Sequence, residues 1–200
     1  AEHIAITSHV SPDDDSIASV LSVYNIITEK YPSKSVRILY TAEPVPRYSI
    51  FKNYDKIEFE NDISGFLENT DLLIVLDGSI LGRFTQYPDK LKEIPTRICI
   101  DHHNSKPDEF TLSLIVPTFS SCAELIYKAF VPTLTKERAE LFLLGILGDT
   151  GNFFHLSLSQ LDTFDIAKKL LQVIGGSIGE FKSRYSSIST RVFTLIEELM

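Results

Sequence analysis

The residues Leu72-Leu73-Ile74-Val75-Leu76 form a run that is apolar throughout, and Asp77 follows it directly. A strand that is open to solvent on one face alternates apolar and polar residues, whereas a strand covered on both faces does not. The run therefore predicts a central strand of a parallel sheet. Because such sheets bind ligands at the carboxyl ends of their strands, Asp77 lies where a functional group is expected.

The rest of the chain predicts strands that alternate with helices and then give way to helices. Further strands are predicted at 3–8, 36–40, 56–59, 97–100 and 112–116, the last at a sheet edge. Apolar residues at helical spacing predict helices at 16–30, 121–130, 136–147, 159–173 and 189–200. The predicted fold is α/β, a Rossmann-like three-layer sandwich with a mainly parallel sheet and a helical C-terminal half.

Composition narrows the class of protein. Two hundred residues, 44% of them hydrophobic, are enough for one well-buried domain. A net charge of −8 argues against extensive electrostatic binding of duplex nucleic acid.

No apolar run reaches membrane-spanning length, and the start lacks the pattern of a signal peptide, so a cytoplasmic protein without a membrane partner is expected. Cys99 and Cys122 show no metal-binding spacing and are interpreted as reduced core thiols.

Acidic and histidine residues recur at the ends of the predicted elements. They are His9 to Asp15 after the first strand, Asp77, Asp101-His102-His103, and Gly148-Asp149-Thr150-Gly151 after an apolar helix. Taken alone, Ser11 to Asp15 suits a helix start, and the last motif suits a helix end. Neither interpretation explains His9 or the acids at equivalent strand ends. An acid at a helix C-terminus is also unfavourable unless a cation compensates it.

Together these residues predict a site for two divalent metal ions. Carboxylates and imidazoles suit Mn²⁺, Mg²⁺, Zn²⁺, Fe²⁺ or Co²⁺, whereas calcium seldom takes histidine. Asp13 and Asp15 can serve different ions while Asp14 points elsewhere, and Asp77 is the candidate bridge. Two such ions can clamp a phosphate and generate a hydroxide, so the reaction predicted is phosphoester hydrolysis.

The two adjacent histidines are expected to have different roles. Neighbouring side chains in an extended segment point to opposite sides. We therefore expect one of His102 and His103 to be a metal ligand. The other would face the substrate or be held by a neighbouring acid.

Four motifs in this order resemble those of the DHH phosphoesterase superfamily. They are His9-x-x-Pro12-Asp13-x-Asp15-Ser16, the strand ending in Asp77, Asp101-His102-His103, and Gly148-Asp149-Thr150-Gly151-Asn152-Phe153. The resemblance implies two metal ions, usually manganese, with magnesium or cobalt as alternatives. It implies one ion held by His9, Asp13 and Asp77, and a second held by Asp15, Asp77, His102 and Asp149. It also implies catalytic roles for His103, which would face the phosphate, and Asp101, which would orient the motif. In the implied mechanism a metal-bridged hydroxide attacks phosphorus.

Within that superfamily, the segments 120–127 and 149–155 resemble one branch most. It contains oligoribonucleases, 3′-phosphoadenosine-5′-phosphate phosphatases and cyclic-dinucleotide phosphodiesterases. The implied substrates are therefore short oligonucleotides, nucleoside 3′,5′-bisphosphates or cyclic dinucleotides. A manganese-dependent inorganic pyrophosphatase or polyphosphatase is the alternative enzyme, and a catalytically silent nucleotide-binding module is the alternative outside enzymes.

The resemblance also implies a domain division. We expect residues 1–185 to form the catalytic domain. Residues 186–200 would be a linker helix toward an absent or separate substrate-binding domain, with a homodimer as the alternative partner. Candidate substrate contacts within the chain are Arg47, Arg83, Asn152 and His155.

Overall fold

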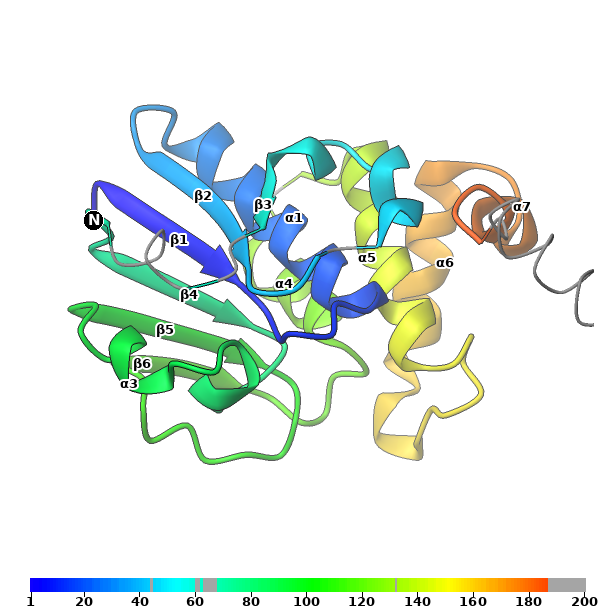
Figure 1. Cartoon of the computed structure of the whole chain (residues 1–200). Helices are drawn as coiled ribbons and strands as arrows, with labels where there is room; N and C mark the ends of the chain where they lie inside the picture. Colours follow the sequence, from blue (N-terminus) through cyan, green and yellow to red (C-terminus); the bar gives the residue numbers. More distant parts are fainter. Residues whose placement is uncertain (44, 60–61, 63–67, 132, 187–200) are drawn as a thin grey trace, which may run out of the picture.

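One parallel sheet of six strands forms the centre of the molecule. The computed structural model describes residues 1–43, 45–59, 62, 68–131 and 133–186. Its strands are β1 (His3–Thr7), β2 (Ser35–Tyr40), β3 (Ile57–Phe59), β4 (Leu72–Leu76), β5 (Thr96–Asp101) and β6 (Leu112–Ile115), in the order β3-β2-β1-β4-β5-β6 (Figure 1). All five pairings are parallel, and β6 is an edge strand. The predicted α/β fold is confirmed.

The apolar run in β4 is explained by its two covered faces. Ile74 and Leu76 belong to the larger core cluster, on the side of α1 (Asp14–Lys30), α4 (Cys122–Phe130) and α5 (Lys136–Asp149). Leu73 and Val75 belong to a smaller cluster on the opposite face. Since full burial of such a side chain contributes about 1.5–3 kcal/mol, neither face tolerates a polar residue well.

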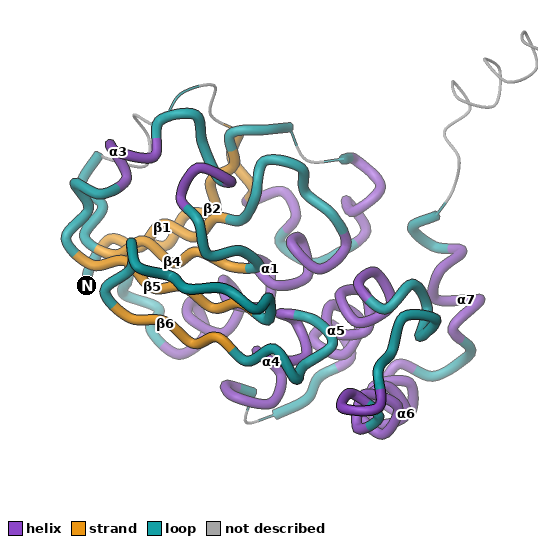
Figure 2. The backbone as a smooth tube through the Cα atoms, turned by 90° about the horizontal axis from the view of Figure 1, so that it is seen from below, coloured by secondary structure: helices purple, strands orange, loops and turns teal. Residues whose placement is uncertain are grey.

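The layers on the two faces differ in thickness. Figure 2 shows α4 on one side of the strands and α3 (Pro88–Leu91) on the other. The thinner layer consists of α3, the 3₁₀ helix η3 (Leu81–Arg83) and the loops around them. Sequence periodicity did not predict these elements, because three or four residues are too few to show a helical repeat.

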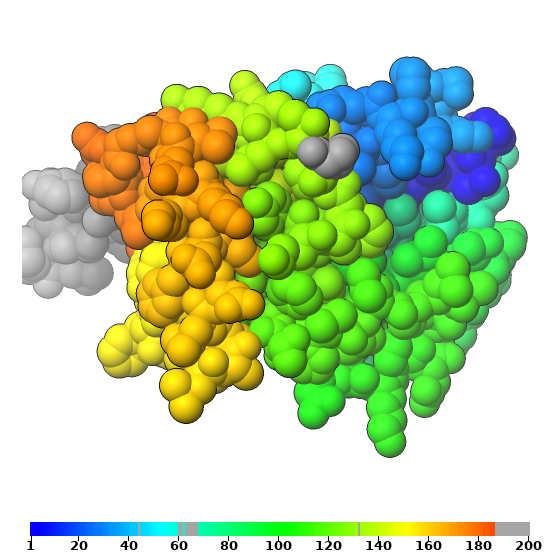
Figure 3. Space-filling view, turned by 180° about the vertical axis from the view of Figure 1, so that it is seen from behind, coloured from blue at the N-terminus to red at the C-terminus, as the bar shows by residue number. Residues whose placement is uncertain are grey.

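The C-terminal part is helical, as predicted. It contains α6 (Asp162–Ile174), which packs on α5, and the short α7 (Ile178–Ser183), which was not predicted. Seen from behind, these helices form one side of the molecule (Figure 3). Further 3₁₀ turns are η1 (Pro46–Ile50), η2 (Tyr54–Lys56) and η4 (Leu158–Gln160). The predicted helix at 189–200 lies outside the described residues. None of the described helices is long and apolar enough to cross a membrane.

The strand order creates a switch point between β1 and β4. From β1 the sheet grows through β2 and β3 on one side, and from β4 through β5 and β6 on the other. Connections leave β1 and β4 in opposite directions, which opens a crevice at their carboxyl ends. The residues at these strand ends therefore converge.

Candidate metal centre

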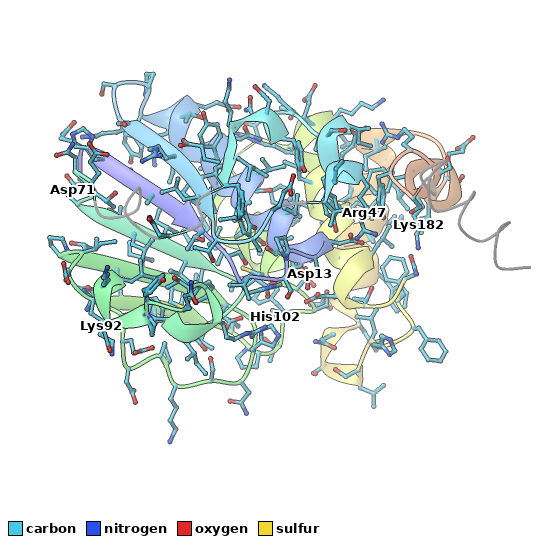
Figure 4. All side chains as sticks on the ribbon, in the orientation of Figure 1. Asp13, Arg47, Asp71, Lys92, His102 and Lys182 are labelled. Atoms are coloured by element: carbon cyan, nitrogen blue, oxygen red, sulfur yellow. The ribbon has the colours of Figure 1, made fainter. Side chains whose placement is uncertain are left out.

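The predicted ligand residues meet at this crevice. His9 follows β1, Asp77 follows β4, and His102 follows β5. Figure 4 places Asp13 and His102 near the carboxyl ends of the strands, far from Asp71 and Lys92 at the other end of the sheet. The donor atoms fall into overlapping groups, in each of which they lie within 4.8 Å of one another. The groups are His9, Asp13 and Asp77; Asp15, Asp77, His102 and Asp149; and Asp77, Asp101, His102 and His103.

Asp77 is common to all three groups. Its Oδ2 lies 3.2 Å from His9 Nε2, and its Oδ1 lies 3.7 Å from both His102 Nε2 and His103 Nδ1. The backbone adopts a left-handed φ of 55° at Asp77, and its N–H donates to the Ile100 carbonyl at 3.0 Å. The turn thus presents one oxygen of this carboxylate to each side of the centre.

The start of α1 supplies two further acids. Asp13 caps the helix by accepting a hydrogen bond from the Ser16 N–H at 2.9 Å, and its other oxygen lies 3.5 Å from His9 Nε2. Asp15, in the first turn of α1, is fully buried, and its two oxygens accept from the N–H groups of Cys122 and Ala123 at 2.6 and 2.8 Å. Asp15 therefore also holds the start of α4 in place.

Two glycines allow α5 to bring Asp149 to the centre. A Cβ at Gly145 would lie 2.5 Å from Asp15 Oδ1, and one at Gly148 would lie 2.4 Å from Asp14 Cβ. Side chains at these positions would keep α5 away from α1. Their absence allows Asp149, the last residue of α5, to reach a point 2.8 Å from His102 Nε2.

The expectation that His102 and His103 point to opposite sides is wrong. Their ring centroids are 4.4 Å apart, and both rings face Asp77. The physical reason is that β5 ends at Asp101, so the alternation of a strand does not extend to the two histidines. The side chain of Asp101 then turns to hold His103, accepting from its backbone N–H at 3.1 Å and lying 2.7 Å from its Nδ1.

The two rings are nevertheless held differently. His102 Nδ1 lies 3.4 Å from the Phe119 carbonyl, which can only accept a hydrogen bond, so in the neutral ring Nδ1 carries the proton and Nε2 presents a lone pair. His103 Nδ1 is occupied by Asp101, and the side chain is 48% exposed, so His103 Nε2 is the atom that can meet a ligand.

The electrostatics of the centre favour a cation. Burial opposes protonation of His9, but hydrogen bonds and charges of Asp13 and Asp77 outweigh it and raise its pKa to about 9. Burial, together with the neighbouring carboxylates of Asp77 and Asp149, raises the pKa of Asp15 well above its usual range. Burial also raises the pKa of Asp149, against the effect of the nearby His102. The centre thus holds more buried carboxylate than its own side chains neutralise.

Two buried polar atoms without hydrogen-bond partners indicate whether these residues fit a metal ion. Among the described residues, Asp77 Oδ1 and His102 Nε2 are buried without a hydrogen-bond partner. The 2.8 Å approach of His102 Nε2 to Asp149 Oδ2 does not have hydrogen-bond geometry. Buried polar atoms are rarely left unpaired, and these face one another across the centre. A divalent ion with imidazole and carboxylate ligands fits this arrangement.

Asp14 points away from the centre, as expected. Its Oδ1 accepts from the buried Tyr48 hydroxyl and from Arg47 Nη2, each at 2.6 Å. Arg47, a candidate substrate contact, is therefore already paired with a carboxylate. Tyr48 was not recognised in the sequence, where nothing marks its link to Asp14.

The other candidate substrate residues lie beside segments that follow the candidate ligands Asp77 and Asp149. Arg83 is exposed, and its Nη1 lies near Gly78, next to Asp77. The His155 ring lies against Gly151, whose missing side chain makes room for it. Asn152 accepts a hydrogen bond from Lys182 Nζ at 2.7 Å. Sequence reasoning missed Lys182, because no motif connects it to a turn thirty positions earlier.

Comparison with known proteins identifies the family. The chain belongs to the DHH family: residues 3–146 match its N-terminal domain. The resemblance inferred from the four motifs is confirmed. The cluster of aspartates and histidines described above is the kind of group that can bind metal ions and is typical of this family.

Two bacterial proteins of known sequence are similar over almost the whole chain. A bifunctional oligoribonuclease and PAP phosphatase of Bacillus subtilis is 28% identical over 192 residues, which cover 92% of this chain and 57% of the relative. A probable enzyme of the same name from Streptococcus mutans is 27% identical over 203 residues, covering 97% of this chain and 62% of the relative.

A solved structure has the same fold. An exopolyphosphatase-related protein from Bacteroides fragilis superposes with a TM-score of 0.83 and 25% sequence identity, covering 99% of this chain and 60% of that one. The chain thus spans about three fifths of the length of these relatives.

Proposed function

We propose that this protein hydrolyses phosphoester bonds of short nucleotides at a site that holds two divalent metal ions. The observation that carries the proposal is the position of Asp77, whose two carboxylate oxygens face separate groups of ligand atoms. A carboxylate shared in this way is suited to bridge two cations. The relatedness to bifunctional oligoribonuclease and PAP phosphatases supports the nucleotide as substrate.

In this proposal the two ions share Asp77 and have no other ligand in common. His9, Asp13 and Asp77 would hold one, and Asp15, Asp77, His102 and Asp149 the other. Manganese is the ion we expect, with Mg²⁺ or Co²⁺ as substitutes. Ions bound there would supply Lewis-acid activation of water and charge stabilisation of the phosphate. Four aspartates balance two doubly charged cations, so an anionic substrate meets no excess negative charge.

His103 and Asp101 act on the substrate side. Asp101 fixes the His103 ring through Nδ1 and leaves Nε2 directed outward. The hydrogen bond to Asp101 raises the pKa of His103, against its burial. The raised pKa favours the doubly protonated ring, whose Nε2–H can donate to a phosphate oxygen as negative charge develops there.

The experiment is hydrolysis by the Mn²⁺-loaded chain. We expect turnover of a dinucleotide and of adenosine 3′,5′-bisphosphate, measured by chromatography, and loss of turnover when a chelator removes the metal. Nucleotide binding without any turnover at saturating Mn²⁺ would instead identify a silent nucleotide-binding module.

A polyphosphatase is the second candidate, and one observation favours it. The Bacteroides fragilis structure is described as exopolyphosphatase-related. Release of orthophosphate from pyrophosphate or polyphosphate far faster than from nucleotides would establish this alternative.

We also propose that residues 1–185 are the catalytic part of a larger binding arrangement. The similar proteins are longer than this chain, which supports a further substrate-binding domain; a second copy of the chain is the alternative. A version of the chain that includes this further domain should show a lower KM and a smaller increase in kcat, because residues that position the substrate contribute binding energy.

A further inference from the structure

The side chain of Lys182 lies over the loop that follows Asp149. It belongs to α7, which is anchored by Phe181 within the helix and by Tyr185 just after it, both 2% exposed. Their rings pack on Phe51 at centroid distances of 6.4 and 6.0 Å. A helix fixed in this way holds Lys182, itself half-buried, in a defined place rather than free in solvent.

The partner of Lys182 is also held in place. Asn152 Oδ1 accepts from Lys182 Nζ at 2.7 Å, and the Asn152 N–H donates to the Leu147 carbonyl at 2.8 Å. Asn152 has a left-handed φ of 59°, within a turn where Gly151 and Phe153 are left-handed too. This tight turn begins directly after Asp149 and its cap residue, so the hydrogen bond to Asn152 holds Lys182 beside the segment that follows a candidate metal ligand.

Carboxylates neutralise the charges of the basic residues near Lys182, but Lys182 itself is bonded to an amide. Arg47 is paired with Asp14 at 2.6 Å and Arg184 with Glu140 at 2.8 Å. Lys182 bonds to a neutral amide, and no carboxylate of the described residues lies within 4.0 Å of its Nζ. Near a centre whose aspartates would be balanced by two ions, this ammonium group is a free positive charge.

We propose that Lys182, oriented by Asn152, binds a second phosphate group of the substrate, at a distance from the phosphate that is cleaved. The inference rests on the proposed function and refines its substrate class. Lys182 would favour nucleotides that carry two phosphate groups, such as dinucleotides and nucleoside bisphosphates, over compounds that carry one. Figure 4 shows Lys182 and Arg47 on the α7 side of Asp13, where the rest of such a substrate would extend.

The test compares two substrates in four variants of the Mn²⁺-loaded chain. The measured quantity is the ratio of kcat/KM for adenosine 3′,5′-bisphosphate to kcat/KM for p-nitrophenyl phosphate. Lys182→Met should lower this ratio about tenfold, the scale of one lost charge-assisted hydrogen bond. Asn152→Asp should lower it as well, since a carboxylate would neutralise the lysine. Lys182→Arg should restore most of the ratio, and Lys168→Met, on the exposed face of α6, should leave it unchanged.

Two outcomes would overturn the proposal: an unchanged ratio in Lys182→Met, or an equal loss in Lys168→Met. Measurements of equilibrium binding test the role of Lys182 independently of whether the chain hydrolyses the substrate. Titration calorimetry with adenosine 5′-monophosphate and with adenosine 3′,5′-bisphosphate reports on Lys182 even if the chain hydrolyses neither. A preference for the bisphosphate that Lys182→Met removes supports the proposal, whereas equal affinities in both proteins reject it.

Discussion

Asp77 has a strained backbone conformation, and its carboxylate lies between two groups of candidate metal ligands. A left-handed backbone at a residue other than glycine costs on the order of 1–3 kcal/mol, although aspartate tolerates it better than most. Asp77 adopts this conformation while almost fully buried. Such strain persists where the surrounding structure holds it, and here it directs the carboxylate between two groups of candidate ligand atoms.

Replacing Asp77 should therefore affect both metal ions at once. We expect Asp77→Ala to lose both, because removing a shared carboxylate leaves two positive charges facing each other. Titration calorimetry and elemental analysis measure the stoichiometry. Asp108→Ala, at an exposed acid outside the centre, should bind metal as the unchanged chain does. Full occupancy of two sites in Asp77→Ala would rule out a bridging role.

His103 gives a different expectation. His103→Ala should keep both ions and lose about 10²–10³-fold in kcat, the usual effect of removing one donor to a developing charge. Metal stoichiometry and steady-state rates are measured on the same sample. If the variant loses an ion instead, His103 is a ligand and the roles assigned to the two rings are exchanged.

At the scale of elements, the contact between α1 and α5 determines whether the centre can form. It depends on glycine at the points of closest approach, where a methyl group would meet Asp15 and Ala123 at 2.5 Å. The sequence Gly148-Asp149-Thr150-Gly151 indicated a helix end, and α5 does end at Asp149. The electrostatically unfavourable position of Asp149 at this helix end would be offset by a bound cation.

We expect Gly145→Ala to destabilise the fold by roughly 1–3 kcal/mol through overpacking and to weaken metal binding. Urea denaturation and Mn²⁺ titration measure the two effects. Gly179→Ala is the matched control, because a methyl group there meets only Ser177 Oγ, at 3.8 Å, and alanine is the better helix former. Equal responses of the two variants would show that the close approach is unimportant.

At the scale of the whole molecule, the charges of the centre link folding to pH. Without metal, His9 has a folded-state pKa of about 9, compared with about 6.5 when unfolded. The folded state then binds the extra proton, so this stabilisation is complete below about pH 6.5 and is lost as pH rises through about 9. The raised pKa values of His102 and His103 act in the same direction.

The chelated chain should therefore become less stable between pH 6.5 and 8.5. Saturating Mn²⁺ should oppose this trend, since the metal needs the deprotonated imidazole. Urea denaturation at several pH values, with chelator and with metal, measures both curves. A chelated chain that gains stability over this range would contradict the charge arrangement described above.

Sequence patterns predicted features that follow from the order of the strands, but they did not predict contacts that depend on exact element ends or on side chains far apart in the chain. Acids after apolar strands could be placed together because parallel strands share one edge, and this brought His9, Asp77 and His102 into one centre. The relative orientation of His102 and His103 depended on where β5 ends, to within a residue. The pairing of Lys182 with Asn152 could not be predicted, because it depends on how a short helix is anchored far along the chain.

The candidate ligands extend from residue 9 to residue 149, and this separation has a kinetic consequence. The group of Asp15, Asp77, His102 and Asp149 is complete only after α5 has packed on α1, which is a late event if the sheet forms first. Metal binding would then stabilise the native state more than the transition state for folding. The ion should lengthen the lifetime of the folded protein by slowing unfolding, while the refolding rate stays nearly the same with or without it.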